Sequence, residues 1–343
     1  MRRIVSILLC IAVLTGLCSC GSDSEYDTLE ITSMNTVMQI TVFKNSETDT
    51  RAILEDMKAC IENMDALFDV NDPDSDISKI NNASAGDVIS VDTHTAQILT
   101  KALDAYQYTN GIFDIRLLPI ISLWGFDNGL YGVPDDVDIS AALESISQGS
   151  FVVDTVNNTV TKTGDTKLAL GGIAKGYLGD VLLRMAQEEN VVAIINLGGN
   201  IILAGDKPDG KPWSVGVKNP LDEENLACSF ESGGNRSVVT SGAYERYFEY
   251  GGQSYHHIID PATGYPADSD LLSVTVIGED GSVCDALSTA LFVAGKEKAI
   301  ELMDTLDSFE FILITESNEL LYTSGVQNVE LSSDAYTLRE IQR

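Results

Sequence analysis

The sequence has little positive charge. Its 343 residues include 21 Lys and Arg against 52 Asp and Glu, so the formal net charge is −31. A field of that sign repels phosphate backbones and anionic lipid headgroups, and we therefore expect no nucleic-acid partner. An anionic small ligand would need its charge neutralised locally, by a metal ion, by helix N-termini or by one of the few basic side chains.

Proline is scarce as well. The chain holds only eight Pro and 44% of its residues are apolar, which excludes disordered and collagen-like proteins. A length of 343 residues corresponds to two domains of about 150 residues each, or to one elaborate domain. No internal repeat and no Pro-, Gly- or Ser-rich linker divides the chain into separately folding units.

No segment approaches the ~20 consecutive apolar residues that a membrane-spanning helix requires. The N-terminus is instead typical of a signal peptide, with the basic start Met1–Arg3 followed by the apolar stretch Ile4–Leu17. The sequence Leu-Cys-Ser-Cys at 17–20 resembles a bacterial lipobox, in which Cys20 becomes the lipidated mature N-terminus. The alternative is an ordinary signal peptide that releases a soluble protein.

The lipobox reading divides the chain into three parts. We expect a lipoprotein signal peptide at residues 1–19, a polar tether at residues 20–28 and one domain over residues 29–343. A lipid on Cys20 would anchor the protein to the extracytoplasmic face of a bacterial cell membrane without spanning it.

Few cysteines remain once the N-terminal segment is set aside. Cys60, Cys228 and Cys284 are odd in number and form no CxxC pair. Neither a disulfide framework nor a zinc site is indicated. We expect all three to be small buried hydrophobes.

Hydrophobic periodicity predicts a mixed fold. Alternation over Glu30 to Phe43 predicts a strand, helical spacing predicts a helix over Thr48 to Phe68, and a second helix is indicated around Ala96 to Tyr106. Short apolar runs predict strands at Phe151 to Asp154, Val191 to Asn196, Ile201 to Ala204, Trp213 to Val217, Ser237 to Thr240 and Ser273 to Ile277.

The C-terminal part adds a hairpin and two helices. Paired glycines tolerate a tight turn, so Glu245 to Tyr250 and Gln253 to Ile259 are predicted to pair around Gly251-Gly252. Asp285 to Val293 and Lys296 to Leu306 have helical patterns.

Histidine is the scarcest titratable residue. Only His94, His256 and His257 could serve as a base near neutral pH. Neighbouring side chains of a strand point to opposite faces, so only one of His256 and His257 is expected to face a given site. A plain hairpin with surface histidines is an equal alternative at this point.

Asp285 and Thr289 are four residues apart at the start of a predicted helix. Their oxygens would lie on one face, close enough to bind one hard cation or one backbone group. The alternative for Asp285 is a helix N-cap, which is the commoner use of Asp at such a position.

Two glycine clusters could approach a ligand. Gly171-Gly172 precedes a predicted helix whose first turn contains Lys175, a geometry that suits phosphate. Gly198-Gly199-Asn200 follows a predicted strand and allows close backbone approach. Either cluster could equally be an ordinary turn.

Taken in order, these segments resemble the bacterial FAD:protein FMN transferases, the ApbE family. The resemblance extends from Met34 to about Gly295. Its segments are MNT at 34–36, DPDSDISKIN at 72–81, GIFDIRLLPIISLWGF at 111–126, LGGIAKGY at 170–177, INLGGNI at 195–201, VVTSGAYERYF at 238–248, YHHIIDPATGYPA at 255–267 and CDALSTALFVAG at 284–295.

The resemblance implies an α+β fold, related to the T-fold, with mixed sheets flanked by helices and an active site in a cleft between two closely integrated lobes. It also implies an enzyme that cleaves the pyrophosphate of FAD with Mg²⁺, passes FMN to a Thr or Ser hydroxyl of a flavoprotein subunit of a membrane redox complex, and releases AMP. Two alternatives are a metal-dependent FAD pyrophosphatase, in which water replaces the hydroxyl, and a surface lipoprotein that binds FAD without reacting.

Residue roles follow from the same resemblance. His257 matches the base position, and the metal ligands would be Asp285, Thr289 and a backbone carbonyl near Gly172. The FAD-lining positions are Met34, Trp124, Gly125, Phe126, Lys175 and Ile259.

The chain departs from the family pattern at three places. Asn71 stands where many members carry an aromatic residue, Ala169 where many carry an acidic one, and Asn35 replaces the glycine of an MGT segment. We expect altered contacts to FAD at the first two positions and an altered turn at the third. No acceptor-type sequence ending in TGAT or TGAS is present, so the chain resembles the modifying enzyme and not its substrate.

Overall fold

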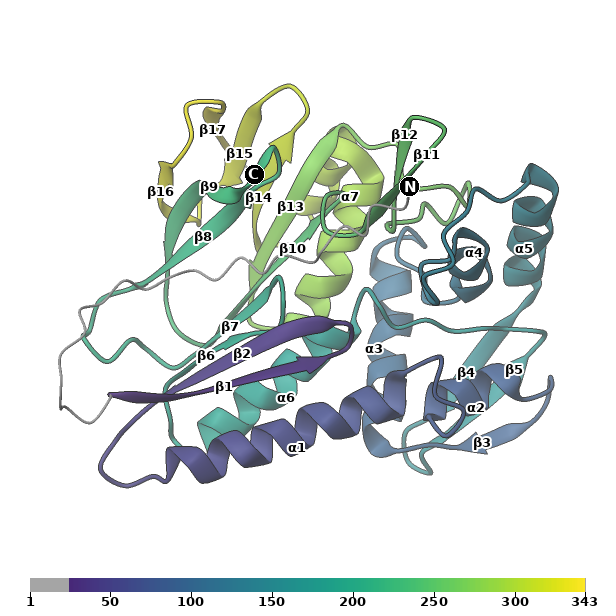
Figure 1. Cartoon of the computed structure of the whole chain (residues 1–343), viewed down its shortest axis with the longest axis horizontal. Coiled ribbons are helices and arrows are strands. Elements are labelled where there is room, and N and C mark those ends of the chain that lie inside the picture. The colour runs from purple at the N-terminus through teal and green to yellow at the C-terminus, as the bar shows by residue number, and fades with distance from the viewer. Residues whose placement is uncertain (1–24, 343) are drawn as a thin grey trace, which may run out of the picture.

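The computed structural model describes residues 25–342. The predicted signal peptide and Cys20 lie outside these residues. The described chain is α+β, as predicted: four sheets and seven helices, with helices packed on the sheets (Figure 1). None of the helices in this part combines the length and apolar character needed to cross a bilayer.

The largest sheet has nine strands. All its neighbouring strands are antiparallel except the last pair, β15 and β17, which run parallel. In spatial order its strands are β1 (Tyr26–Ser33), β2 (Thr36–Phe43), β6 (Ala193–Asn196), β7 (Asn200–Ala204), β10 (Arg236–Gly242), β13 (Leu271–Gly278), β14 (Glu310–Thr315), β15 (Glu319–Thr323) and β17 (Thr337–Ile341).

Helices cover one face of this sheet. They are α1 (Thr50–Phe68), α6 (Ala174–Glu188) and α7 (Gly281–Met303). The predicted apolar face of α1 is buried, including Ile53, Met57 and Ile61. Consecutive residues of β13 separate the two faces of the sheet, since Val276 packs with α7 whereas Ile277 joins the cluster on the other side.

A three-stranded sheet covers part of the opposite face. Its order is β16 (Gln327–Leu331), β9 (Asp222–Ser232), β8 (Trp213–Asn219). Trp213 and Phe230 of this sheet pack against Ile277 and Ile312 of the large one. This small sheet, with β16 near the C-terminus, therefore lies on the face opposite the helices.

The second lobe lies beside the helical face. It consists of α2 (Asp76–Asn82), α3 (Thr93–Tyr108), α4 (Leu118–Trp124), α5 (Asp136–Gln148) and a three-stranded sheet in the order β3 (Val88–Ser90), β5 (Thr159–Thr163), β4 (Ser150–Asp154) (Figure 1). One apolar cluster contains Phe151 and Val160 of this lobe together with Leu182 and Ile195 of the large-sheet lobe. The shared core makes the two lobes closely integrated.

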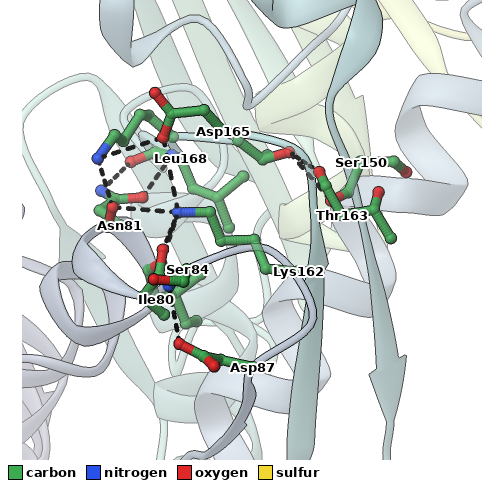
Figure 2. A network of polar contacts seen from close by, with 12 residues as sticks. Ile80, Asn81, Ser84, Asp87, Ser150, Lys162, Thr163, Asp165 and Leu168 are labelled. Atoms are coloured by element: carbon green, nitrogen blue, oxygen red, sulfur yellow. Dashed lines mark hydrogen bonds and ion pairs between the residues drawn. The ribbon is translucent and has the colours of Figure 1, made fainter.

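A buried lysine fixes α2 to β5. The ammonium of Lys162, a residue with no exposed surface, donates to the carbonyl oxygens of Ile80, Asn81 and Ala83 at 2.7–3.2 Å (Figure 2). These carbonyls lie at the C-terminal end of α2, where helix carbonyls lack intrahelical partners. Burial lowers the pKa of the Lys162 ammonium.

Two predictions about elements were wrong in detail. The single strand over Glu30 to Phe43 is a hairpin, β1 and β2, whose turn residues Met34 and Asn35 have φ of 47° and 59°. A two-residue turn does not interrupt the alternation of apolar and polar residues, so the sequence shows one continuous strand pattern across both strands. In addition, β1 begins at Tyr26, three residues before the predicted start of the domain.

The predicted C-terminal helices are also different. They form one element, α7, broken at Gly295, whose φ of 74° is not helical. This helix begins at Gly281, because Asp280 accepts from the N–H of Val283 and so provides the N-cap. Asp285 is therefore inside the helix, and the N-cap alternative for it was wrong.

The glycine-turned hairpin is present but shorter than predicted. It consists of β11 (Tyr247–Tyr250) and β12 (Gln253–His256), joined by Gly251 and Gly252 with φ of 61° and 85°. Several elements had no sequence prediction, namely α2, α4, α5, β3, β5, β9, β14, β15, β16 and β17.

Candidate functional site

The crossing of α6 and α7 places the predicted metal-ligating carboxylate. The backbone N–H of Gly176 donates to Asp285 Oδ2 at 2.8 Å. A Cβ at Gly176 would lie 2.6 Å from Asp285 Cβ and would overlap the carbonyl of Gly281. Glycine at 176 therefore allows the two helices to approach until Asp285 reaches the first turn of α6.

Hydroxyl groups gather one turn further along α7. Thr289 Oγ1 lies 3.5 Å from Ser241 Oγ of β10, which is 2.7 Å from Ser288 Oγ. A Cβ at Gly172 would lie 3.4 Å from Thr289 Oγ1, so Gly172 faces the same hydroxyl. The structure thus brings the three predicted metal-ligating residues to one place, and Gly172 and Thr289 are partly exposed there.

The glycine turn between β6 and β7 lies on the other side of Lys175. Lys175 Nζ donates to the carbonyl of Gly198 at 3.0 Å. Gly198 and Gly199 have φ of 75° and 101°, and a side chain at 198 would overlap Thr36. Both glycine clusters flagged in the sequence therefore meet at one lysine.

Asn200 follows this turn. Its side chain is 1% exposed. Its amide does not reach strict hydrogen-bond geometry, but it faces Asp285 closely enough to lower the pKa of that carboxyl. The Asn200 amide and the Gly176 N–H therefore both act on the Asp285 carboxylate.

Asp285 is a buried acid. Its side chain is nearly inaccessible, and this burial raises the pKa of the carboxyl, whereas the Lys175 ammonium and the Gly176 N–H lower it by less. A divalent cation at the carboxylate would favour the ionised form. In residues 25–342 no group of three or more His, Cys, Asp or Glu side chains could hold a metal, so any cation here must also use hydroxyl or carbonyl oxygens.

The two adjacent histidines differ in their hydrogen bonds. His256 uses both ring nitrogens: Nε2 donates to the carbonyl of Ala267 at 3.1 Å, and Nδ1 accepts from the N–H of Ile258. Its ring packs edge-on against Phe292 of α7. His256 is therefore fully engaged in holding the hairpin to α7.

His257 keeps one nitrogen available. Its Nδ1 is 3.1 Å from the carbonyl oxygen of Arg246, which also accepts from the His257 N–H. A carbonyl only accepts, so Nδ1 carries the proton of the neutral ring and Nε2 keeps its lone pair. The ring lies edge-on to Phe126, away from the Phe292 side that His256 faces, so the two histidines face opposite sides as predicted.

The surroundings keep His257 neutral. Burial, followed by the charge of Arg246, lowers the pKa of its imidazole to about 3, while the hydrogen bond to the Arg246 carbonyl opposes the shift. Lys175 also lowers it, which puts His257 and Asp285 under the influence of the same ammonium group. A neutral imidazole with a free Nε2 can accept a proton.

Four of the predicted FAD-lining residues form part of the protein's own core. Trp124 has no exposed surface and its Nε1 donates to the carbonyl of Gly264 at 2.9 Å. Phe126 and Ile259 are about 5% exposed and pack in the same cluster. Gly125 ends α4 with a φ of 76°, where a side chain would overlap the carbonyl of Leu130. These residues support the loop behind His257, and their side chains present little surface to a ligand.

The other two FAD-lining predictions, Met34 and Lys175, are partly exposed. Met34 lies in the β1–β2 turn, and the backbone N–H of Met34 donates to Asp65 Oδ2. Asn35 has a left-handed φ of 59°, a conformation that Asn tolerates better than most residues.

The two departures near the predicted FAD site have structural partners. Asn71 donates from Nδ2 to the carbonyl of Asp127, so it helps to hold the loop after Phe126. The N–H of Ala169 donates to the carbonyl of Ile115.

Sequence reasoning did not select several residues of this region. They are Gly176, Ser241, Arg246 and Ser288, and all lie within the segments that carried the family resemblance. Asn200 was flagged only for its backbone, as part of the glycine cluster at 198–200. His94, the third histidine, lies on α3 and its Nδ1 is 3.0 Å from Tyr177 Oη.

The family model of the ApbE family matches residues 34–313 of this chain. This chain belongs to the ApbE family. A FAD:protein FMN transferase of Klebsiella pneumoniae is 35% identical over 269 residues, covering 77% of this chain and 82% of that protein. One of Treponema pallidum is 30% identical over 343 residues, covering 94% and 93%.

Solved structures of the ApbE family share the fold. The ApbE protein of Thermotoga maritima is 31% identical, with a TM-score of 0.78 over 90% of this chain and 97% of that chain. The flavinyl transferase ApbE of Pseudomonas stutzeri, in its apo form, is 26% identical, with a TM-score of 0.74 over 85% and 91%. The family resemblance read from the sequence and the fold it implied are confirmed.

Proposed function

We propose that this member of the ApbE family is an Mg²⁺-dependent FAD:protein FMN transferase. It cleaves the pyrophosphate of FAD, attaches FMN through a phosphoester bond to a Thr or Ser hydroxyl of an extracytoplasmic flavoprotein subunit, and releases AMP. The name borne by its relatives agrees with this activity. The observation that carries the proposal is the bond from His257 Nδ1 to the carbonyl of Arg246, which leaves Nε2 free, in a site where the Lys175 charge acts on both His257 and the buried carboxylate of Asp285.

His257 would act on the acceptor hydroxyl. As the hydroxyl oxygen attacks the FMN phosphorus, its proton passes to Nε2 of His257. The new oxygen–phosphorus bond replaces the bond to the AMP phosphate, which leaves. Arg246 assists by fixing the tautomer through its carbonyl.

Asp285, Thr289 and the backbone at Gly172 would hold Mg²⁺. The fit rests on the donor set: carboxylate, hydroxyl and carbonyl oxygens are the ligands that this hard cation prefers. Gly172 leaves the space next to Thr289 Oγ1 open, because it has no side chain. When bound, the ion supplies positive charge to the pyrophosphate. This matters because a chain of net charge −31 has few cationic side chains to offer.

Lys175 completes the donor set toward FAD. Its ammonium is suited to phosphate oxygens. Met34 would contact the flavin or adenine, whereas Trp124, Gly125, Phe126 and Ile259 shape the loop beneath it.

The lipid anchor remains part of the proposal. A lipid on Cys20 would hold the enzyme at the extracytoplasmic face of the membrane, where flavoprotein subunits of membrane redox complexes are within reach. Labelling with a fatty-acid probe tests it: the wild type incorporates the probe and Cys20→Ala does not. Equal incorporation by both would reject Cys20 as the anchor.

The test of function measures three products together. The protein is mixed with FAD, Mg²⁺ and the acceptor protein of the Klebsiella pneumoniae relative, and AMP, free FMN and protein-bound FMN are quantified. A transferase gives one bound FMN for each AMP. AMP with an equal amount of free FMN would identify the pyrophosphatase, and bound FAD without AMP would identify the binder.

A further inference from the structure

The region next to His257 carries apolar side chains that the reaction itself does not use. On the hairpin β11–β12, Phe248 is paired with Tyr255 across the strands, and Tyr250 is paired with Gln253. Cross-strand partners point to the same face, and so do alternate residues of one strand. Phe248 and Tyr250 therefore share one face of the hairpin.

The loop after α4 extends this face. The ring of Tyr131 stacks on Phe248 at 5.2 Å with an interplanar angle of 14°, and both rings contact Phe126 at 5.6–5.7 Å. Phe126 in turn touches the ring of His257 at 6.3 Å. We call Leu130, Tyr131, Phe248 and Tyr250 the aromatic rim. It begins beside His257 and follows the hairpin toward the Gly251-Gly252 turn. The hairpin β11–β12 is near the top of Figure 1.

Much of the rim is open to solvent. Leu130 is 79% exposed, Tyr250 62% and Tyr131 48%. Exposed apolar side chains that stand singly need no explanation, but a contiguous group of them marks an interaction site. Rigid tyrosines on a supported surface are typical of protein interfaces, since they bury a large area at low entropic cost.

The reaction determines what can cover this surface. The hydroxyl that loses its proton belongs to a folded protein and must reach Nε2 of His257, so the chain on either side of that hydroxyl must lie against whatever borders the histidine. From His256 to Gln253 the strand covers three steps, or ~10 Å at ~3.3 Å per residue. An extended segment of three or four acceptor residues would span this distance.

We propose that the aromatic rim is the docking surface for the acceptor protein, and that it binds the apolar side chains flanking the hydroxyl to be modified. The inference rests on the proposed function, because only a protein acceptor needs such a surface. It assigns to the rim recognition of the acceptor and no contact with FAD, whose phosphates would lie at Lys175 and at the proposed Mg²⁺ site beside Asp285.

The test compares two double variants. Leu130→Ser with Tyr250→Ser removes the two most exposed rim side chains without touching the Tyr131–Phe248 stack. Val88→Ser with Val156→Ser is the matched control, because these residues are 64% and 89% exposed on the β3–β5–β4 sheet and its turn, at the opposite end of the molecule from the hairpin in Figure 1. Steady-state transfer to the acceptor of the Klebsiella pneumoniae relative and FAD binding, by quenching of flavin fluorescence, are measured for both.

We expect kcat/KM for the acceptor to fall by about 10-fold or more in the rim variant, through KM, at an unchanged Kd for FAD. The control variant should keep both values. Equal kcat/KM in the two variants would overturn the docking role of the rim while leaving the transferase activity intact. A rise in the Kd for FAD in the rim variant would also overturn it, because it would place the rim in the FAD site. A rim variant that loses a wild-type dimer on size exclusion but transfers normally would also overturn it, in favour of self-association. Absence of transfer by the wild type would instead count against the proposed function.

Discussion

The backbone N–H of Gly176 donates to Asp285 Oδ2 across the crossing of α6 and α7. The bond joins the segment that carries Lys175 to the helix that carries Thr289, two pieces of sequence more than one hundred residues apart. The close approach depends on the absence of a side chain at 176.

Gly176→Ala should therefore destabilise the protein although alanine favours helices. The new Cβ would lie 2.6 Å from Asp285 Cβ, so the helices must separate. We expect a loss of about 3 kcal/mol in the free energy of unfolding, measured by urea denaturation. Gly171→Ala is the control, because a Cβ there meets nothing within 4 Å and its φ is not in the left-handed region. Equal stability of the two variants would show that the crossing tolerates a methyl group.

Asp285→Asn should remove stabilisation by Mg²⁺. Ligand that binds only the folded state raises the melting temperature in a saturable way, and we expect this rise for the wild type. In Asp285→Asn the rise should vanish. Without Mg²⁺ the variant should be at least as stable as the wild type at pH 7, because burial opposes the ionised carboxyl.

The matched control for the metal prediction is Asp304→Asn, an exposed carboxylate at the other end of α7. It should keep the full Mg²⁺-dependent rise. An unaltered Mg²⁺ response of Asp285→Asn would remove Asp285 from the metal site.

The pH dependence of transfer should reflect the lowered pKa of His257. With a pKa of about 3, the imidazole stays neutral well below the ordinary value of 6.5, so its protonation should not reduce kcat between pH 5 and 7. Arg246→Met removes a neighbouring cation and should move the acid limb upward toward 6.5. Exposed Arg184→Met on α6 should leave the profile unchanged. An acid limb at 6.5 in the wild type would contradict the lowered pKa of the base.

The same shift affects stability with a definite sign. Below pH 6.5 the unfolded chain binds a proton at His257 that the folded chain does not accept until about pH 3. The free energy of unfolding should thus fall as the pH is lowered through this window, and more in the wild type than in His257→Ala.

Lys162→Met should destabilise the second lobe. The lysine has no exposed surface, and its loss removes a donor from the carbonyls of Ile80, Asn81 and Ala83. The Asn81 carbonyl keeps the Lys167 ammonium at 2.6 Å and the Ile80 carbonyl keeps the Ala83 N–H at 3.3 Å, so the Ala83 carbonyl is affected most. We expect a decrease of about 2–3 kcal/mol in the free energy of unfolding by chemical denaturation. Lys298→Met, an exposed lysine of α7, should change it by less than ~0.5 kcal/mol. An unchanged free energy of unfolding for Lys162→Met would mean that water replaces the ammonium as the donor to these carbonyls.

Local signals predicted what depends on local physics. The apolar face of α1 and the Gly251-Gly252 turn follow from spacing and from the tolerance of glycine for positive φ, and both are present. Short elements such as α4 and β3 gave no signal because three to seven residues hold too little periodicity. The Met34-Asn35 turn was hidden because it preserves the alternation.

The features that the sequence did not predict depend on packing between segments that are far apart in the chain. The sequence contains no sign that Trp124 is wholly buried or that Gly176 lies against Gly281, since both follow from contacts between distant segments. Likewise, the choice between His256 and His257 required the hydrogen bonds of each ring. Only the folded chain shows that both nitrogens of His256 are used and that His257 keeps Nε2 free.

The most direct test of His257 as the base is the intact mass of the acceptor protein after incubation with FAD, Mg²⁺ and either the wild type or His257→Ala. FAD binding by both proteins is measured in parallel. His94→Ala, which alters a histidine on α3, is the control. We predict an acceptor heavier by one FMN with the wild type and with His94→Ala, and an unmodified acceptor with His257→Ala at an unchanged affinity for FAD. Transfer by His257→Ala at the wild-type rate would contradict the assignment of His257 as the base.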